Sequence, residues 1–468
     1  MATINIFRSY LKTPFLVLLV IEIFVLLLSV YTGSVLRFYP DHELVFQALQ
    51  DLWLKAVIIT VVTAMSMLAT GLYQGQIREG MAGVLIRIMI SFVASGILAS
   101  LIFYLLPSLI LGRGIMALAY FQAFFIIGTI RVIFFEVVDT STFKKRILIY
   151  GAGRTASHID SKLRRKADRR GFEIIGYLPI EKQDIVVKTE KLIDSPASLL
   201  GYARKNNIDE IVVAISDISY EISVDELVDC KLSGITVIDI LTFFEREAGQ
   251  IRIDIIDPGW LVTSDGFRQS RLQDAFKRAF DILASFIILS VAAPFLILTA
   301  IAILIEDGWR APMFYSQIRI GKDGVPYKVY KFRSMRVDAE KQGEAVWATK
   351  TDSRVTRVGA FIRKTRLDEF PQIANVLNGT MSFVGPRPER PEFVEELKKE
   401  IPYYNERHLV KPGVTGWAQL LYPYGSSIND SYQKQLFDMY YVKNHSLFLD
   451  CLILLQTVEV VLFGKGAR

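Results

Sequence analysis

Cysteine and histidine are scarce in this chain of 468 residues, and their scarcity narrows the chemistry that it can perform. It contains two cysteines and four histidines, and Cys230 and Cys451 lie far apart with no metal-ligand spacing. We therefore expect neither a structural disulfide nor a zinc site. We also expect no cleavable signal peptide, because the first apolar run lacks a small-residue cleavage site and further apolar runs follow it.

Charge of one sign is only weakly in excess, with a net charge of +6. No nucleic-acid-binding motif accompanies it, so we expect anionic lipids and phosphate-bearing substrates as partners, and no nucleic acid. Hydrophobic residues make up 51% of the chain, more than a soluble protein usually carries. Since the chain is also too long for one ordinary domain, its composition predicts a membrane protein with two or three domains.

Residues 1–143 are predicted to form a transmembrane anchor of four helices. Basic residues precede the first apolar segment and follow the last at Lys144–Arg146, which places both ends of the anchor in the cytoplasm. Glu22, Arg87 and Arg131 lie within the spans. They indicate an intramembrane site or, in the interpretation we favour, snorkelling or pairing between helices. The apolar segments, each long enough to cross a hydrocarbon core of ~30 Å, cover about 14–31, 52–73, 82–106 and 114–138.

Residues 144–262 show short apolar strands alternating with polar, helix-like stretches, which predicts a doubly wound α/β domain. The first strand runs into Gly151–Ala156, a G-x-G-x-x-A turn typical of dinucleotide binding. The acidic residue expected to bind ribose is missing, and the domain has no Tyr-x-x-x-Lys pair. We therefore favour a structural or regulatory Rossmann-like domain over a redox one, and leave nucleotide binding open.

A fifth apolar stretch, Ala279–Ile305, is long enough to span the bilayer but carries two unusual features. Positive charge flanks both of its ends, at Lys277-Arg278 and at Arg310, which favours two cytoplasmic ends. Pro294 lies in its middle, where it removes a backbone hydrogen bond and favours a break. A helix that enters one leaflet, bends at Pro294 and leaves on the same side satisfies both features. We favour this re-entrant, proline-broken helix over the alternative, a kinked spanning helix, which would put Asp368 outside the cell.

Two adjacent carboxylates, Asp368 and Glu369, follow closely on Arg363 at what the pattern predicts as the first turn of a helix. Pro371 suits an early helical position, the apolar Ile373, Val376 and Leu377 fit its buried stripe, and Asn378-Gly379 is a stop signal. Taken alone, such a pair is usually a cap on a solvated helix face. Among arginines that hold anionic phosphates, however, it suits phosphoryl chemistry with an aspartate nucleophile and a metal-binding glutamate.

Five short motifs follow one another in the C-terminal half of the chain. Together with a membrane helix interrupted by proline, they resemble those of the bacterial polyprenyl-phosphate hexose-1-phosphate transferases, the monotopic phosphoglycosyl transferases. The catalytic resemblance covers about Leu272–Arg468. The four-helix anchor and the Rossmann-like domain, together the front end of the chain, resemble those of the large, undecaprenyl-phosphate-dependent members. It implies an α/β monotopic catalytic domain over residues 263–468, on the cytoplasmic face of a bacterial inner membrane. The motifs are Lys277–Asp281, Tyr330–Met335, Leu367–Glu369, Gly385–Pro388 and Lys411–Trp417.

The resemblance also implies a two-step reaction in the initiating step of exopolysaccharide assembly. Asp368 would attack the sugar-linked phosphate of a UDP-hexose and release UMP, and undecaprenyl phosphate would then attack the resulting sugar-phosphoryl-aspartate. Glu369 would help to hold Mg²⁺. Arg363 and Arg387 match phosphate-binding arginines of the family, and Lys331 matches its functional lysine. A homodimer formed through the front end is a further implication, and the identity of the hexose stays open.

Two departures from the family pattern and two rival functions remain. Ala293 stands before the helix-breaking proline where the family commonly has serine, and Gln419 is followed by Leu420–Gly425 in place of an arginine-containing segment.

One rival function is that of a membrane-anchored nucleotide-sugar dehydratase that uses the glycine-rich turn. The other is a membrane scaffold for glycan assembly, in which the two carboxylates are structural. Release of UMP from a UDP-sugar in the presence of polyprenyl phosphate separates all three.

Overall fold

The structure, a computed structural model, divides into two compact units, Met1–Gly249 and Gln250–Arg468. Arg310 lies outside the described residues, and so do Pro423 and Tyr424 of the segment Leu420–Gly425. Those described are 3–6, 9–73, 80–138, 144–163, 166–169, 171–180, 183–215, 223–256, 258–264, 266–267, 270–308, 312–336, 354–422, 425 and 427–462.

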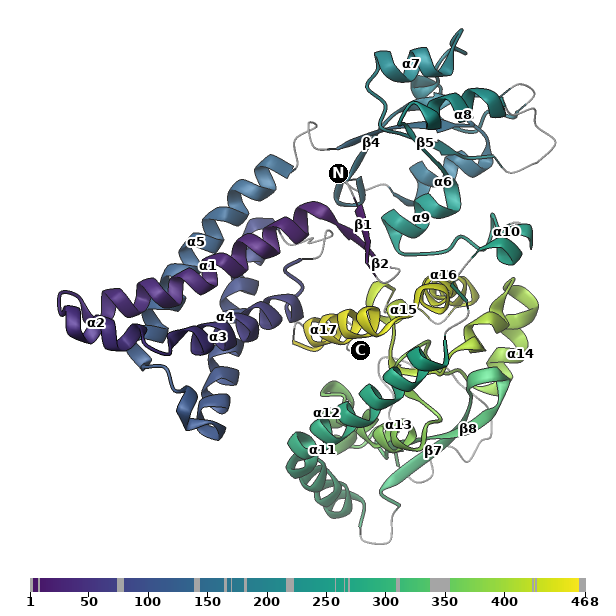
Figure 1. The fold of residues 1–468 in the computed structure, drawn as a ribbon. Coiled ribbons are helices and arrows are strands. Elements are labelled where there is room, and N and C mark those ends of the chain that lie inside the picture. The colour runs from purple at the N-terminus through teal and green to yellow at the C-terminus, as the bar shows by residue number, and fades with distance from the viewer. Residues whose placement is uncertain are drawn as a thin grey trace. The chain divides into compact units, whose positions relative to one another are not determined.

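The first unit opens with a strand hairpin followed by the apolar helices (Figure 1). The helices α1, α3, α4 and α5 are each long and apolar enough to cross a membrane, which confirms the four predicted segments. Pro14 lies in the first turn of α1, where a missing N–H removes no helical hydrogen bond. The elements are β1 (Thr3–Ile6), β2 (Ser9–Lys12), α1 (Thr13–Phe38), α2 (His42–Leu49), α3 (Leu52–Ala69), α4 (Gly80–Leu105), η1 (Pro107–Leu109) and α5 (Arg113–Val138).

The charged residues inside this bundle pair between helices. Glu22 of α1 and Arg131 of α5 are fully buried, and Arg131 Nε lies 2.6 Å from Glu22 Oε1. Arg131 Nη1 also donates to the carbonyl of Leu72, at 2.7 Å. Arg87 of α4 donates to the carbonyl of Thr70, which follows α3, at 2.5 Å. These contacts confirm the pairing interpretation, since each guanidinium satisfies groups that hydrocarbon would leave unsolvated.

The rest of the first unit is a four-stranded parallel sheet with helices between its strands, as the sequence predicts. Its strand order is β4-β3-β5-β6, and all three strand pairs are parallel. The glycine-rich turn follows β3 and leads directly into α6. The elements are β3 (Lys145–Tyr150), α6 (Arg154–Lys162), β4 (Phe172–Leu178), α7 (Leu199–Lys205), β5 (Glu210–Val213), α8 (Val224–Leu232), β6 (Thr236–Asp239) and α9 (Ile240–Ala248), with short turns η3 (Lys166–Arg169) and η4 (Thr189–Lys191).

The second unit combines an antiparallel strand pair, β7-β8, and a parallel pair, β9-β10, with helices of very different lengths. Its elements are α10 (Pro258–Thr263), α11 (Arg271–Asp307), β7 (Phe314–Ile320), η5 (Lys322–Gly324), β8 (Pro326–Phe332), α12 (Arg357–Lys364), η6 (Leu367–Gln372), α13 (Ile373–Asn378), β9 (Ser382–Val384), α14 (Pro391–Glu400), η7 (Tyr404–Leu409), β10 (Gly413–Thr415), α15 (Trp417–Leu421), α16 (Ile428–Asn444) and α17 (Leu447–Leu462).

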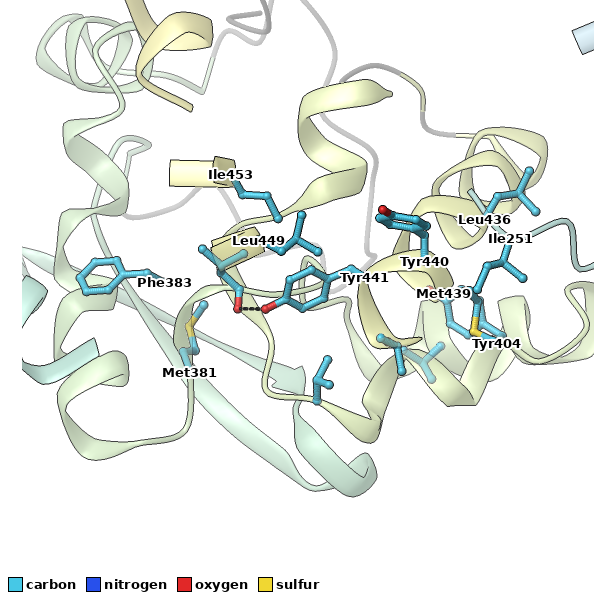
Figure 2. Close-up of a cluster of buried hydrophobic side chains, with 14 of the residues drawn as sticks. Ile251, Met381, Phe383, Tyr404, Leu436, Met439, Tyr440, Tyr441, Leu449 and Ile453 are labelled. Atoms are coloured by element: carbon cyan, nitrogen blue, oxygen red, sulfur yellow. Dashed lines mark hydrogen bonds between the residues drawn. The ribbon is translucent and has the colours of Figure 1, made fainter. Parts of the chain in front are cut away.

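One hydrophobic core, made largely by α16, α17 and β9, holds the second unit together. Figure 2 shows Tyr441 beside Leu449 in this core, with its hydroxyl donating to the carbonyl of Val384 at 3.0 Å. Residues 250–262, which the sequence analysis groups with the Rossmann-like domain, belong to the second unit. Ile251 is buried in the same core, and its N–H donates to the carbonyl of Leu436 at 3.0 Å.

The long helix α11 begins with a capping box formed by Ser270 and Gln273, and runs through Pro294 without interruption over 37 residues. The helix changes direction partway along (Figure 1), so it is bent and not broken. Near its start, Arg278 donates to the last carbonyls of α13, and near its end Glu306 accepts the first N–H groups of α12. Most of the large apolar side chains between Leu283 and Ile305 are exposed, which leaves a broad apolar surface on this helix.

Candidate active site

The two carboxylates lie in the 3-10 helix η6, and not in the first turn of an α-helix as the sequence analysis expects. Pro371 explains the difference, because it has no N–H to donate and the α-helical pattern begins only at Ile373. Of the predicted stripe, Ile373 and Val376 are buried and Leu377 is half-buried, and the stop signal is confirmed because Gly379 ends α13 in the left-handed conformation with φ of +86°. Arg366, just before the pair, has a φ of +60°, an uncommon conformation for a residue other than glycine.

Glu369 is surrounded by three cations. Its Oε1 atom accepts from Lys331 Nζ at 3.0 Å and from Arg387 Nη2 at 3.4 Å, and its Oε2 lies 3.6 Å from Arg366 Nη1. Burial opposes ionisation of this carboxyl, but Lys331, Arg387 and Arg366 outweigh it and hold the pKa of Glu369 below its usual value. Glu369 is therefore a permanent anion at neutral pH.

Asp368 has a different environment, although it is the next residue. Its Oδ1 atom is buried and has no hydrogen-bond partner among the described residues. Burial and the charge of Glu369 raise the pKa of Asp368, whereas Lys331, Arg366 and Arg363 lower it. A buried carboxylate oxygen without a donor is poorly stabilised, which makes it a better nucleophile than one held by hydrogen bonds.

All five residues that the sequence analysis assigns to phosphate chemistry line one cavity of about 760 Å³: Lys331, Arg363, Asp368, Glu369 and Arg387. Arg387 Nη1 also donates to Gln419 Oε1, at 3.3 Å. Pro294 does not line this cavity, and α11 contributes Ile288 to it instead. The residues of the local motifs therefore meet in one cavity, and Pro294 lies outside it, within α11.

The cavity is lined by six cationic side chains, four carboxylates and a larger set of apolar side chains. Cations and apolar groups together suit a ligand that carries both phosphate and hydrocarbon. The cationic residues are Lys331, Arg363, Arg366, Arg387, Arg407 and Lys434, and the apolar ones are Ile288, Phe370, Ile373, Phe383, Val414, Leu420, Leu454 and Val458.

Close backbone contacts help to position Arg387 next to Asp368 and Glu369, the two carboxylates that form the dyad of the site. A Cβ atom on Gly385 would lie 2.2 Å from the carbonyl of Lys411, and one on Gly413 would lie 2.1 Å from the N of Gly385. Both positions therefore require glycine, because the segments that contain the paired strands β9 and β10 approach each other closely. This explains physically why the Gly-Pro-Arg-Pro and Lys-Pro-Gly motifs occur together: one segment holds the other.

The sequence analysis gives no role to four charged residues that line the cavity: Arg366, Arg407, Lys434 and Asp438. Arg407 and Asp438 are buried and form a 2.8 Å ion pair, and Lys434 Nζ donates to the carbonyl of Gly425 at 2.8 Å. A single sequence signal points to this group: Asp438 is a lone carboxylate within the apolar stretch Leu436–Val442.

A magnesium ion fits this site only if a substrate completes its coordination. The described residues contain no group of three or more His, Cys, Asp or Glu side chains arranged to hold a metal. Asp368 and the ionised Glu369 supply carboxylate oxygens, one of which lacks a protein partner. Mg²⁺ is usually held by one or two carboxylates together with substrate phosphates, so the residues present suit this ion.

Comparisons with known proteins place the chain among sugar transferases. The profile of the bacterial sugar transferase family matches residues 272–464, and that of a CoA-binding domain matches residues 68–233. The chain is 41% identical over 242 residues to a UDP-N-acetylgalactosamine-undecaprenyl-phosphate N-acetylgalactosaminephosphotransferase of Aeromonas hydrophila, over 52% of this chain and 56% of that protein. It is 30% identical over 357 residues to an undecaprenyl-phosphate galactose phosphotransferase of Salmonella typhimurium, over 69% of each.

A shorter relative extends the comparison. An exopolysaccharide production protein of Rhizobium leguminosarum bv. phaseoli is 41% identical over 199 residues, which make up 41% of this chain and 97% of that protein. The chain spans only 56% of the Aeromonas hydrophila relative. The family profile nevertheless covers all but the first residue of α11 and everything from there to the end of α17, the part of the chain that builds the cavity. The chain therefore belongs to the bacterial sugar transferase family of phosphoglycosyl transferases, and its homologues are undecaprenyl-phosphate hexose-1-phosphate transferases.

Proposed function

We propose that this protein transfers a hexose-1-phosphate from a UDP-hexose to undecaprenyl phosphate, giving undecaprenyl-diphospho-hexose and UMP. One observation carries the proposal: a carboxylate oxygen of Asp368 that has no hydrogen-bond partner among the described residues shares a cavity with six cationic side chains and many apolar ones. A nucleotide sugar needs the cations, and a polyprenyl phosphate needs both. The names of the relatives support the same two substrates.

In the first step, Asp368 is the nucleophile. An oxygen of its carboxylate attacks the phosphorus that bears the sugar, and the bond from that phosphorus to the bridging oxygen breaks. UMP leaves with the electron pair, and a sugar-phosphoryl-aspartate remains. Arg363 and Arg387 face the phosphates and offset their charge, and Mg²⁺, where bound, supplies further charge neutralisation at the diphosphate.

In the second step, an oxygen of undecaprenyl phosphate attacks the same phosphorus, and the Asp368 carboxylate is the leaving group. Since one phosphoanhydride replaces another, the overall reaction is nearly balanced in energy, and positioning of the two phosphates matters most. The apolar wall, which includes Ile288 of α11 and Leu454 and Val458 of α17, accommodates the isoprenoid chain next to the reacting group.

Glu369 and Lys331 form the fixed electrostatic frame of the site. Glu369 is ionised and surrounded by Lys331, Arg387 and Arg366, so it holds these cations near the phosphates without itself attacking. The roles of two adjacent carboxylates are thus divided by their environments: Glu369 is tied to donors, and Asp368 presents an oxygen without one. Glu369 is the residue that would also ligate Mg²⁺.

The helix α11 re-enters the membrane in this proposal, and the catalytic unit lies on the cytoplasmic face. A straight helix would separate Arg278 from Glu306 by ~42 Å at 1.5 Å per residue. Yet Arg278 is bonded to α13, and Glu306 to α12, two helices separated only by a threonine, an arginine and the short η6. Both ends of α11 are therefore tied to one body, which favours two cytoplasmic ends over a crossing.

Cysteine-accessibility labelling next to Arg278 and Glu306 tests this topology in intact cells. Labelling of both positions from the cytoplasmic side alone is the expected result. Labelling of the two positions from opposite sides of the membrane would refute the re-entrant arrangement. A Pro294→Leu variant should favour a straight helix and reduce activity, because it would pull α12 away from the dyad.

Release of UMP tests the activity itself. The purified protein in detergent is incubated with undecaprenyl phosphate, Mg²⁺ and each of a series of UDP-sugars, and UMP is measured. Strong release with one sugar is expected, and the screen identifies which hexose is used. Absence of release with every sugar would refute the proposed function. A dehydratase would instead convert the sugar without lipid, and a scaffold would do neither.

Two further proposals concern the whole chain. The reaction places a first sugar on a lipid carrier, so we propose that the protein initiates assembly of an exopolysaccharide, as the name of the Rhizobium relative supports. We also propose a homodimer formed through the first unit. Light scattering of the full chain in detergent checks this, and a monomeric mass would contradict it.

A further inference from the structure

The buried pair Arg407 and Asp438 connects three elements around the proposed active site. Arg407 Nη2 lies 2.8 Å from Asp438 Oδ2 and donates at 3.0 Å to the carbonyl of Arg387. Its Nη1 donates to the hydroxyl of Tyr404, at 2.5 Å. The Arg407 side chain is 7% exposed and that of Asp438 is 2% exposed. One guanidinium therefore joins η7, α16 and the loop that follows β9.

Arg387 needs such an anchor. Its side chain is 44% exposed, and its contacts with Glu369 and Gln419, at 3.4 and 3.3 Å, are long for hydrogen bonds. A long, half-exposed side chain loses its position easily, because holding it costs rotamer entropy. The backbone of Arg387 is the part that the molecule fixes, through the carbonyl bond to Arg407.

We infer that Arg407, charge-balanced by Asp438, is a positioning residue that holds Arg387 against the catalytic dyad. This inference rests on the proposed function. Both terminal nitrogens of Arg407 are engaged with protein groups, and one of these groups is the backbone carbonyl of Arg387, so Arg407 acts on substrate phosphates by fixing Arg387. A buried ion pair contributes little net stability, which suits a pair that is kept for geometry.

A double-mutant cycle tests the inference. Arg407→Lys keeps the charge, but its single nitrogen cannot take the places of both Nη1 and Nη2, which reach acceptors on different elements through the planar fork of the guanidinium. We expect Arg407→Lys to lower kcat/KM for UMP release at least tenfold. In an Arg387→Ala background the same change should have almost no further effect, because the residue that it positions is gone.

Two controls separate the possible causes. Thermal unfolding of each variant is measured, and Asp438→Asn, which keeps the shape of the partner, should show a smaller loss of the same kind. Multiplicative effects of Arg407→Lys and Arg387→Ala, or full activity of Arg407→Lys, would overturn the inference. Wild-type protein that releases no UMP would instead overturn the proposed function, so the two failures are distinguishable.

A second, independent observation concerns the glycine-rich turn of the first unit. The N–H of Ala152 donates to Gln183 Oε1 at 2.9 Å, and the carbonyl of Ala152 accepts from the N–H groups of Val186 and Val187 at 3.0 and 3.3 Å. A Cβ on Gly153 would lie 2.7 Å from Gln183 Nε2. The side-chain amide of Gln183 therefore lies against the turn, where dinucleotide-binding domains bring the pyrophosphate close to the backbone.

We propose that residues 183–187 act as an intramolecular ligand of this turn, so that the domain binds neither CoA nor a dinucleotide through it. The Gln183 carbonyl oxygen takes the place of a phosphate oxygen on the N–H of Ala152, and the amide fills the space that Gly153 leaves. The glycines thus serve close packing within the chain, and the turn contributes to the stability of the sheet.

Calorimetric titration of the full-length protein with CoA and with NADH tests this proposal. We expect no saturable binding of either ligand at millimolar concentration, and a lower unfolding temperature for Gln183→Ala, which leaves the N–H of Ala152 without its partner. Micromolar binding of CoA or NADH by the wild-type protein would overturn the proposal. An unchanged unfolding temperature in Gln183→Ala would do the same.

Discussion

Replacing Lys331 with methionine probes the electrostatic frame of the proposed active site most cleanly. Lys331 Nζ lies 3.0 Å from Glu369 Oε1, and the two side chains are 26% and 13% exposed. Methionine matches the length of much of the lysine side chain but removes the charge. Arg387 and Arg366, at 3.4 and 3.6 Å from Glu369, remain as partners, so the variant should still fold.

The expected magnitude follows from these distances. Two unit charges at 3.0 Å attract each other by ~5 kcal/mol at an effective dielectric constant of about 20. Desolvation of both ions offsets much of this, and the two arginines continue to balance Glu369. We therefore expect Lys331→Met to lose about 2 kcal/mol of transition-state stabilisation, which is roughly a 30-fold fall in kcat/KM. Lys331→Arg, which keeps the charge, should lose less.

The pH profile gives this prediction a second readout. Lys331 lowers the pKa of both Asp368 and Glu369, so its removal should raise both. Since the nucleophile must be ionised, the acidic limb of the profile should move to higher pH in Lys331→Met. The assay is initial-rate UMP release over a pH series. Wild-type kcat/KM in Lys331→Met, or an unshifted acidic limb, would refute the electrostatic argument.

Three further outcomes are expected. Arg131→Met should destabilise the membrane bundle by about 3–5 kcal/mol, because it leaves buried Glu22 without its cation, and adding Glu22→Gln should restore most of the loss in thermal unfolding. Gly385→Ala should destabilise by about 3 kcal/mol through backbone overlap, whereas Gly201→Ala, with only ordinary contacts, should raise the unfolding temperature slightly. Activity should fall on acidification at a higher pH than an ordinary carboxyl would give, because burial and Glu369 raise the pKa of Asp368; a pH-independent rate would contradict this.

The elements that depend on local sequence could be predicted. The four apolar helices follow from run length, and the parallel sheet follows from short strands alternating with helix-like stretches. Ile373, Val376 and Gly379 could be placed in or after one helix because periodicity and a stop signal are local properties. That Lys331, Arg363, Asp368 and Glu369 share one cavity agrees with the common site that the family resemblance implies, and not with any local property of the sequence.

The contacts that join distant segments could not be predicted. Nothing local shows that Arg407 bonds the carbonyl of Arg387 and the carboxylate of Asp438, or that Gln183 lies on the Gly153 turn. The dyad itself was placed in the wrong kind of helix, because the missing N–H of Pro371 delays the α-helical pattern by one short turn. Tertiary packing decides the contacts of Arg407 and Gln183, whereas the position of the two carboxylates is a local effect of Pro371.

The most direct measurement of the central proposal is capture of a covalent intermediate. Wild-type protein is incubated with UDP-hexose radiolabelled in the sugar, without undecaprenyl phosphate, and peptides are mapped. We expect one label per active site on Asp368, stoichiometric UMP, loss of the label when undecaprenyl phosphate is added, and no label in Asp368→Asn. Label on another residue, or lipid product formed with no protein-bound label and with sequential instead of ping-pong kinetics, would contradict nucleophilic catalysis by Asp368.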